Sequence, residues 1–73
     1  SLINLNLGMQ TRLTMKDNIF LVCSLLNISR KETKEKFNSI AEFAGLQNFV
    51  GTKLYQFSNG MLQRLAFSIA IFV

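Results

Sequence analysis

The spacing of hydrophobic and polar residues changes along the chain, and each spacing predicts a different element. Apolar and polar residues alternate over residues 2–7, which predicts a short strand that ends at Gly8. Residues 9–13 form a mostly polar connection. Over residues 15–26, apolar side chains recur at helical spacing and extend around most of the circumference, so we predict a helix that is buried on most sides.

Capping residues mark where the predicted helices begin and end. Thr14 with Asp17, and Ser29 with Glu32, have the spacing of a capping box, in which the first side chain accepts a hydrogen bond from an unpaired helix N–H. Residues 27–28 form the turn between these two helices. Gly45 has the place of the glycine that commonly ends a helix. The second helix is predicted to bury a face formed by Phe37, Ile40, Ala41 and Ala44.

The rest of the sequence is arranged around a turn at Ser58. We predict a short helical turn over residues 46–50, an extended approach over residues 53–57, and a strongly apolar last helix that begins at Asn59 or Gly60. Ser58 is a favoured N-cap residue. Gly60 has no Cβ and leaves the backbone open to a charged ligand. The turn is therefore either an ordinary capped helix or a helix N-terminus that holds a phosphate.

Composition limits the chemistry available to the chain. Seventy-three residues form one small domain at most, and domains of this size are marginally stable. Cys23 is the one cysteine and histidine is absent, so no internal disulfide can form and we expect no metal site. Cys23 lies in an apolar run, which predicts a buried and inert thiol.

Charge and hydrophobicity indicate what kind of partner the chain has. The net charge of +4 is dispersed and predicts a mild preference for anionic partners. Residues 30–36 mix both signs without interleaved aromatics, so we interpret them as a solvated helix face and expect no nucleic-acid partner. Hydrophobic residues make up 49% of the chain, which predicts packing against further protein. The sequence begins without Met and ends inside an apolar run, so we interpret it as a fragment of a larger domain.

Three stretches carry a resemblance to a known family. They are Leu13-Thr14-x-x-Asp17-Asn18-Ile19, Phe43-Ala44-Gly45-Leu46 and Phe57-Ser58-Asn59-Gly60-Met61-Leu62-Gln63-Arg64-Leu65-Ala66-Phe67. In this order the chain resembles the helical subdomain of ABC transporter ATPases, most closely the branch that exports O-antigen, capsule and teichoic acid. The common signature of the family is Leu-Ser-Gly-Gly-Gln. In that branch it is often aromatic-Ser-x-Gly-Met, the form found in this chain.

The resemblance implies a mainly α fold, with three main helices plus a short N-terminal extended segment, inside a larger α/β P-loop ATPase domain. Residues 1–13 would form the Q-loop region, residues 14–57 the helical subdomain, and residues 58–73 the signature motif and its helix. The sequence contains no Gly-x-x-x-x-Gly-Lys-Ser/Thr stretch, so Walker A is absent, and Walker B is absent as well. This fragment alone is therefore not expected to hydrolyse ATP.

The resemblance also implies how nucleotide would be bound. In the family, two ATP-binding subunits close head-to-tail on two ATP molecules with Mg²⁺, and each ATP lies between the Walker A loop of one subunit and the signature of the other. By position, Ser58 would offer its hydroxyl and Gly60 its backbone N–H to the γ-phosphate. Asn59 replaces the first signature glycine, and its side-chain amide is the candidate for a contact there. Met61, the fourth of these signature residues expected to meet the nucleotide in trans, replaces the glutamine, which removes a polar contact. Arg64 matches an arginine with a structural role.

Two further contacts are implied in the first half of the chain. Relatives carry a Q-loop glutamine upstream of the Leu-Thr pair, and Leu5 has that place in this sequence, so Asn4 and Gln10 are the candidates for its role. The apolar face around Phe20 and Leu21 would contact the transmembrane permease subunit. The intact protein would then lie peripherally at the cytoplasmic face of the cell membrane.

The function implied by the resemblance is the coupling of ATP binding and hydrolysis to export of a cell-surface polysaccharide. Two alternatives from other classes stay open. One is a self-contained small basic helical module that binds a protein or nucleic acid and has no catalytic activity. The other is an amphipathic domain that lies on a membrane surface. The membrane alternative is disfavoured because the basic residues gather on the second predicted helix, whereas the most apolar residues lie on the first and last.

Overall fold

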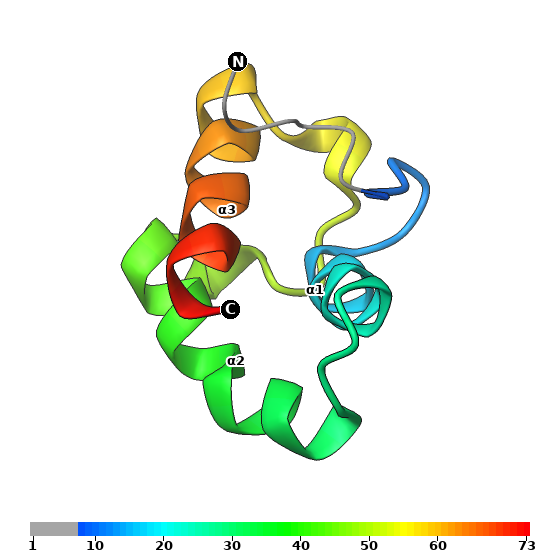
Figure 1. The fold of residues 1–73 in the computed structure, drawn as a ribbon. Helices are drawn as coiled ribbons and strands as arrows, with labels where there is room; N and C mark the ends of the chain where they lie inside the picture. Colours follow the sequence, from blue (N-terminus) through cyan, green and yellow to red (C-terminus); the bar gives the residue numbers. More distant parts are fainter. Residues whose placement is uncertain (1–7) are drawn as a thin grey trace.

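A computed structural model describes residues 8–73, which contain three α-helices and two short 3-10 turns. The α-helices are α1 (Met15–Leu25), α2 (Arg30–Ala44) and α3 (Asn59–Phe72), and the 3-10 turns are η1 (Gln47–Phe49) and η2 (Leu54–Gln56). Helix α2 packs against both α1 and α3, and α2 and α3 lie side by side (Figure 1). The predicted mainly α fold is confirmed. The strand predicted over residues 2–7, which includes Asn4, lies outside the described residues.

The N-cap half of each predicted capping box is present where α1 and α2 begin, while among the described residues neither acidic side chain bonds back to the cap N–H. The hydroxyl oxygen of Thr14 accepts a hydrogen bond from the N–H of Asp17 at 3.1 Å, and that of Ser29 accepts one from the N–H of Glu32 at 3.1 Å. Each cap satisfies one of the N–H groups that a helix leaves without an internal acceptor. Helix starts could be predicted from sequence because both partners lie within one turn of each other.

The helix ends follow the predicted turn chemistry with one small difference. Asn27 takes a left-handed backbone conformation (φ 64°) after α1, which asparagine tolerates better than most residues. Gly45 ends α2 in the same region (φ 71°), and the N–H of Leu46 donates to the carbonyl of Ala41 at 2.9 Å, as in a Schellman motif. Helix α1 ends one residue earlier than predicted, with Leu26 as its C-cap.

The hydrophobic core lies between the three helices and the two 3-10 turns. Its buried members are Met15, Ile19, Val22, Cys23, Ile40, Ala41, Ala44, Leu46, Leu54, Phe57, Leu65 and Ile69. The predicted inner face of α2 is confirmed at three of its four positions, while Phe37 is only half-buried. The predicted burial of Cys23 is also confirmed. Burial raises the pKa of the Cys23 thiol, and a hydrogen bond with Thr33 opposes this in part, so the thiol stays protonated at neutral pH.

Asn18 is fully buried and organises the connection that precedes α1. The backbone N–H of Gln10 donates to its Oδ1 at 2.6 Å. Its Nδ2 donates to the carbonyls of Gln10 at 3.0 Å, Leu13 at 3.2 Å and Thr14 at 2.8 Å. The amide orientation follows from these partners, because an N–H only donates and a carbonyl only accepts. One side chain thus fixes the path of an irregular loop against the helix.

The start of α1 is also joined to the chain segment that leads to Ser58. The N–H of Met15 donates to the carbonyl of Thr52, and the N–H of Lys16 donates to the carbonyl of Val50, both at 3.0 Å. Together with the Thr14 cap, these bonds satisfy the first N–H groups of α1. The N-terminus of α1 is therefore closed by protein groups and offers nothing to an anion.

The prediction of an extended approach over residues 53–57 is wrong. These residues include η2, in which the N–H of Phe57 donates to the carbonyl of Leu54 at 2.9 Å. Leu54 and Phe57 are three positions apart, so both reach the core from one face of a 3-10 turn. A short apolar-polar-polar-apolar run fits such a turn as well as a strand. No neighbouring strand within residues 8–73 was available to favour the extended form; Lys53 makes only an isolated bridge with Thr14.

Ser68 is the second buried polar group that the packing depends on. Its hydroxyl donates to the carbonyl of Ile40 at 2.7 Å and joins α3 to α2 inside the core. This explains how a serine is accommodated in the apolar run of α3. Helices within residues 8–73 are all too short or too polar to cross a bilayer.

Asn18→Ala should destabilise the fold by about 3 kcal/mol, because it leaves the N–H of Gln10 without an acceptor and removes a second donor from the carbonyls of Gln10 and Leu13. Urea unfolding measures the change. Asn38→Ala is the matched control, since Asn38 is an exposed asparagine in helix α2. It should change the free energy of unfolding by no more than about 0.5 kcal/mol. Equal effects of the two substitutions would contradict the role given to Asn18.

Cys23 should react with iodoacetamide at pH 8 more than about tenfold slower in the folded protein than in urea, because burial both blocks access and disfavours the thiolate. Mass spectrometry of timed samples measures the rate. Labelling of the native protein at the rate of the unfolded protein would show that Cys23 is accessible in solution.

Candidate functional site

The turn at Ser58 presents unpaired donors at the start of α3. The hydroxyl oxygen of Ser58 accepts a hydrogen bond from the N–H of Met61 at 3.1 Å, and its carbonyl accepts one from the N–H of Leu62 at 3.0 Å. Within residues 8–73, the N–H groups of Asn59 and Gly60 donate to no acceptor. The Ser58 hydroxyl keeps its own proton to donate. Ser58, Asn59 and Gly60 are exposed, so this end of α3 offers three donors to solvent.

Apolar anchors hold this polar turn on both sides. Before it, Phe57 is buried, and its ring meets the ring of Phe49 edge-on with centroids 6.2 Å apart. After it, Met61 packs partly buried against the core, and Leu65 is fully buried. The turn is therefore exposed but fixed in position, which is what a binding site made of backbone donors requires.

Gly60 is not required by the fold. Its backbone does not have the left-handed conformation seen at Gly45, and a Cβ built on it would lie 3.9 Å from its two nearest neighbours, Nη1 of Arg64 and Oγ of Ser58. Glycine inside a helix costs roughly 0.5–1 kcal/mol relative to alanine. The space around Gly60 and its ordinary backbone therefore leave the identity of this residue unexplained by contacts within residues 8–73.

Arg64 joins the helix that follows the turn to the end of α2. Its Nε donates to the carbonyl of Ala44 at 3.1 Å. A cation at a helix C-terminus interacts favourably with the helix dipole, and the hydrogen bond satisfies a carbonyl at the end of α2. This geometry agrees with the structural role that the resemblance implies for Arg64.

Open N–H groups alone do not distinguish this turn. At the start of α2, the N–H groups of Arg30 and Lys31 also lack an acceptor within the described residues. What differs is the combination at α3, where an exposed hydroxyl stands beside a glycine that the fold does not need. The sequence predicted the positions of Ser58 and Gly60, but only the structure shows that Gly60 has free space around it.

The two Q-loop candidates are not brought to the turn by anything that the structure describes. Asn4 lies outside residues 8–73. Gln10 is exposed, and its backbone is held by Asn18. The apolar pattern around Asn18 did not mark it as the residue that fixes this connection. Its position after Asp17 in the Leu-Thr-x-x-Asp-Asn stretch was the available signal.

The contact face predicted around Phe20 and Leu21 is partly a groove. A hollow of about 340 Å³ lies between the start of α1 and the first half of α2. It is lined by Lys16, Phe20, Arg30, Lys34, Phe37 and Val50. Phe20 and Phe37 stack within it, with ring centroids 5.9 Å apart. Leu21 is half-buried and does not line this groove, so the structure brings one of the two predicted residues to it.

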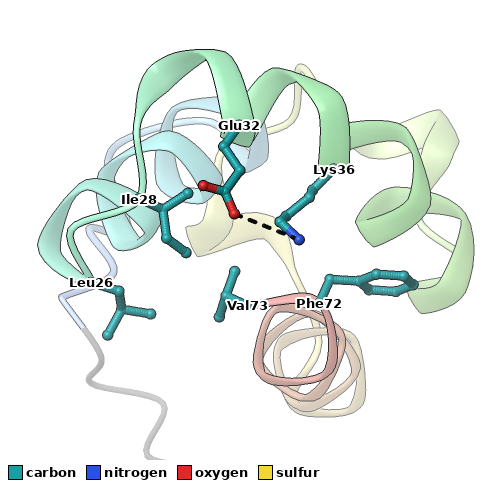
Figure 2. Close-up of a pocket in the computed structure, with 6 residues that line it drawn as sticks. All are labelled: Leu26, Ile28, Glu32, Lys36, Phe72 and Val73. Carbon is teal, nitrogen blue, oxygen red and sulfur yellow. Dashed lines mark ion pairs between the residues drawn. The ribbon is translucent and has the colours of Figure 1, made fainter.

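A larger hollow of about 520 Å³ lies at the other end of α3 from Ser58. Figure 2 shows its lining, in which side chains of the α1–α2 turn and the end of α3 face a charged pair on α2. The two charged groups, Glu32 Oε2 and Lys36 Nζ, lie 3.9 Å apart. The hollow is lined by both apolar side chains and this charged pair, and none of its lining residues belongs to the turn at Ser58.

Comparison with known proteins gives the same family as the motifs. No family model matches the chain. The chain is 36% identical over 69 residues to the O-antigen export system ATP-binding protein RfbB of Klebsiella pneumoniae, which covers 94% of the chain and 28% of that protein. It is 35% identical over 71 residues to the teichoic acids export ATP-binding protein TagH of Enterococcus faecalis, covering 97% of the chain and 16% of that protein.

A third relative bears the family name directly. The ABC transporter protein AbcA of Aeromonas salmonicida is 33% identical over 70 residues, which cover 96% of the chain and 23% of AbcA. The chain thus spans less than a third of the length of these relatives, and the matches extend over nearly all of its residues. The resemblance carried by the signature turn and the upstream motifs is confirmed: this chain is a homologue of ABC transporter ATP-binding proteins of the O-antigen and teichoic acid export branch.

Proposed function

We propose that the intact protein containing this chain is the ATP-binding subunit of an ABC transporter and that it couples ATP binding and hydrolysis to export of a cell-surface polysaccharide. The observation that carries the proposal is the exposed turn of Ser58, Asn59 and Gly60, which combines free donors with a glycine that the fold does not require. The names of the curated relatives support the same function. A self-contained basic module would not account for these relatives.

In this proposal the turn binds nucleotide in trans. The Ser58 hydroxyl and the Gly60 N–H donate to the γ-phosphate of an ATP held with Mg²⁺ by a second ATP-binding subunit. The exposed Asn59 side chain adds an amide donor beside them. Fixed donors at a helix N-terminus stabilise the charge on the transferred phosphoryl group without reorganising, which is the main way that such sites accelerate hydrolysis. Met61 contributes packing against the core.

The rest of the chain would connect this site to its partners. Residues 1–13 are proposed as the Q-loop region, with Gln10 or Asn4 in the role of the glutamine. Residues 14–57 form the helical subdomain and residues 58–73 the signature and its helix. The face that includes Phe20 would contact the transmembrane permease subunit, with the protein lying peripherally at the cytoplasmic face of the membrane.

Gly60→Asp should lower the ATPase rate of the assembled transporter more than about a hundredfold. The new carboxylate would occupy the space through which the γ-phosphate approaches the backbone and would repel its negative charge. Folding should be preserved, since there is space for a side chain and an acidic residue is favourable in the first turn of a helix. Gly60→Ala should give an intermediate loss with unchanged or higher stability. Steady-state phosphate release and thermal melting measure the two properties separately.

Gly51→Asp is the matched control, because Gly51 is also exposed, has no neighbour within 4 Å of a built Cβ and gains the same charge. It should keep the wild-type ATPase rate. Wild-type turnover of the Gly60→Asp transporter, or an equal loss in both variants, would refute the role given to the turn.

The gene surrounding this sequence offers an independent check. It should encode a Gly-x-x-x-x-Gly-Lys-Ser/Thr stretch before Ser1 and an apolar strand ending in acidic residues after Val73, because the trans site needs a Walker A loop and a Walker B strand. Sequencing the flanking DNA decides this. Flanks without either motif would contradict the proposed ATPase.

A further inference from the structure

The groove between α1 and α2 combines an aromatic floor with a basic rim. The stacked rings of Phe20 and Phe37 form the floor, and the guanidinium of Arg30 stands 4.9 Å from the centroid of the Phe20 ring. Lys16 and Lys34 are exposed at its margin. Within residues 8–73, none of these three cations lies within ion-pair distance of a carboxylate. The groove therefore carries three positive charges that pair with no carboxylate among the described residues.

We propose that this groove binds a segment of the permease in which an apolar anchor is flanked by carboxylates. The anchor side chain would lie on the rings of Phe20 and Phe37, and the carboxylates would face Lys16, Arg30 and Lys34. This inference rests on the proposed permease contact and specifies the chemistry of the partner. Such a segment would be complementary to the groove, because a half-buried apolar floor favours an apolar side chain and three like charges around it favour acidic ones.

The shape of the groove distinguishes a protein segment from a small anion. A phosphate needs donors that converge on one point. Here the cations belong to two helices and surround an apolar floor, so they do not converge. The volume of about 340 Å³ has room for one or two large apolar side chains. An apolar anchor with charges at its sides is the arrangement of an amphipathic helix bound in a groove.

A neighbouring hollow indicates in which orientation the proposed partner segment would bind. It has a volume of about 320 Å³ and shares Phe37 and Val50 with the basic groove. Its one charged lining residue is Glu42, from the second half of α2. A segment that extends across both hollows would place its acidic end at Lys16, Arg30 and Lys34 and keep its other end free of carboxylates near Glu42.

Photo-crosslinking in the assembled transporter tests the proposal directly. Benzoylphenylalanine replaces Phe37 in the full-length protein, which is then assembled with its permease in nanodiscs of neutral lipid and irradiated. The expected crosslink, mapped by mass spectrometry, is to a permease segment with at least two Asp or Glu residues within one helical turn of the crosslinked side chain. The same replacement at Phe43, an exposed phenylalanine of α2 that does not line the groove, should not label this segment. A crosslink to a neutral or basic segment, to lipid, or to the same chain would overturn the proposal.

Charge reversal provides a second measurement. Lys16→Glu together with Lys34→Glu should weaken binding of the permease at least about tenfold at low salt, and the difference from wild type should shrink as salt rises. Reversing the crosslinked permease carboxylates to lysine should restore binding. Lys31→Glu is the control, since Lys31 lies on the same helix outside the groove lining. An unchanged affinity, or an equal loss with Lys31→Glu, would refute the acidic partner.

The outcomes separate this inference from the proposed function. If the turn at Gly60 proves to be essential for ATPase activity while groove charge reversal has no effect, the ATPase assignment stands and the acidic-segment proposal fails. If the full-length protein binds anionic-lipid vesicles without permease, and Lys16→Glu with Lys34→Glu abolishes that binding, the groove serves a membrane surface and the proposal is also refuted. In the absence of the permease, the full-length protein should bind nucleotide equally well as wild type, with Lys16→Glu and Lys34→Glu together, and with Lys31→Glu.

Discussion

The arrangement of this chain depends on the buried amide of Asn18. A polar group without partners in a core costs free energy, so its four hydrogen bonds leave the connection before α1 a single path. That path brings the carbonyl of Leu13 to the N–H of Leu54 and so fixes η2, which carries the chain to Ser58. The connection before α1 and η2, which leads to the turn at Ser58, are therefore held by one continuous set of backbone and amide hydrogen bonds.

The described residues satisfy the polar groups in their core but do not bury all of their large apolar side chains. Inside, Asn18, Thr33 and Ser68 all find partners, and no buried side-chain polar atom of the described residues is left without one. Outside, large apolar side chains remain exposed, including Phe43 and Phe67, whose rings stack on each other 6.2 Å apart between α2 and α3. The described residues thus satisfy their buried polar side chains but leave large apolar side chains exposed. This is expected of a segment that matches less than a third of each of the relatives compared.

Local interactions made part of this structure predictable, and contacts between distant residues made the rest unpredictable. The caps at Thr14, Ser29 and Ser58 join residues three positions apart, so the sequence displays both partners together. The hydrogen bonds of Arg64 to Ala44 and of Ser68 to Ile40 join residues 20 and 28 positions apart, so no local sequence pattern predicts them. The prediction of an extended segment in place of η2 was wrong for the same reason. Burial of Leu54 in the core, and not local propensity, favours the 3-10 turn. The groove forms only where α1 and α2 pack together. The sequence therefore indicated Phe20 as a contact residue but not the cations around it.

The two glycines at helix ends show how fold and function can be separated in such a chain. Gly45 lies in the left-handed region, so the backbone itself explains it. Gly60 lies in ordinary helical backbone with free space around it, so its presence lowers helix stability without any structural return in residues 8–73. The proposed approach of a phosphate to the unpaired donors beside Gly60 would account for a glycine at this position. The cations around Phe20 likewise have no carboxylate within ion-pair distance among the described residues, which is why a partner was proposed for them.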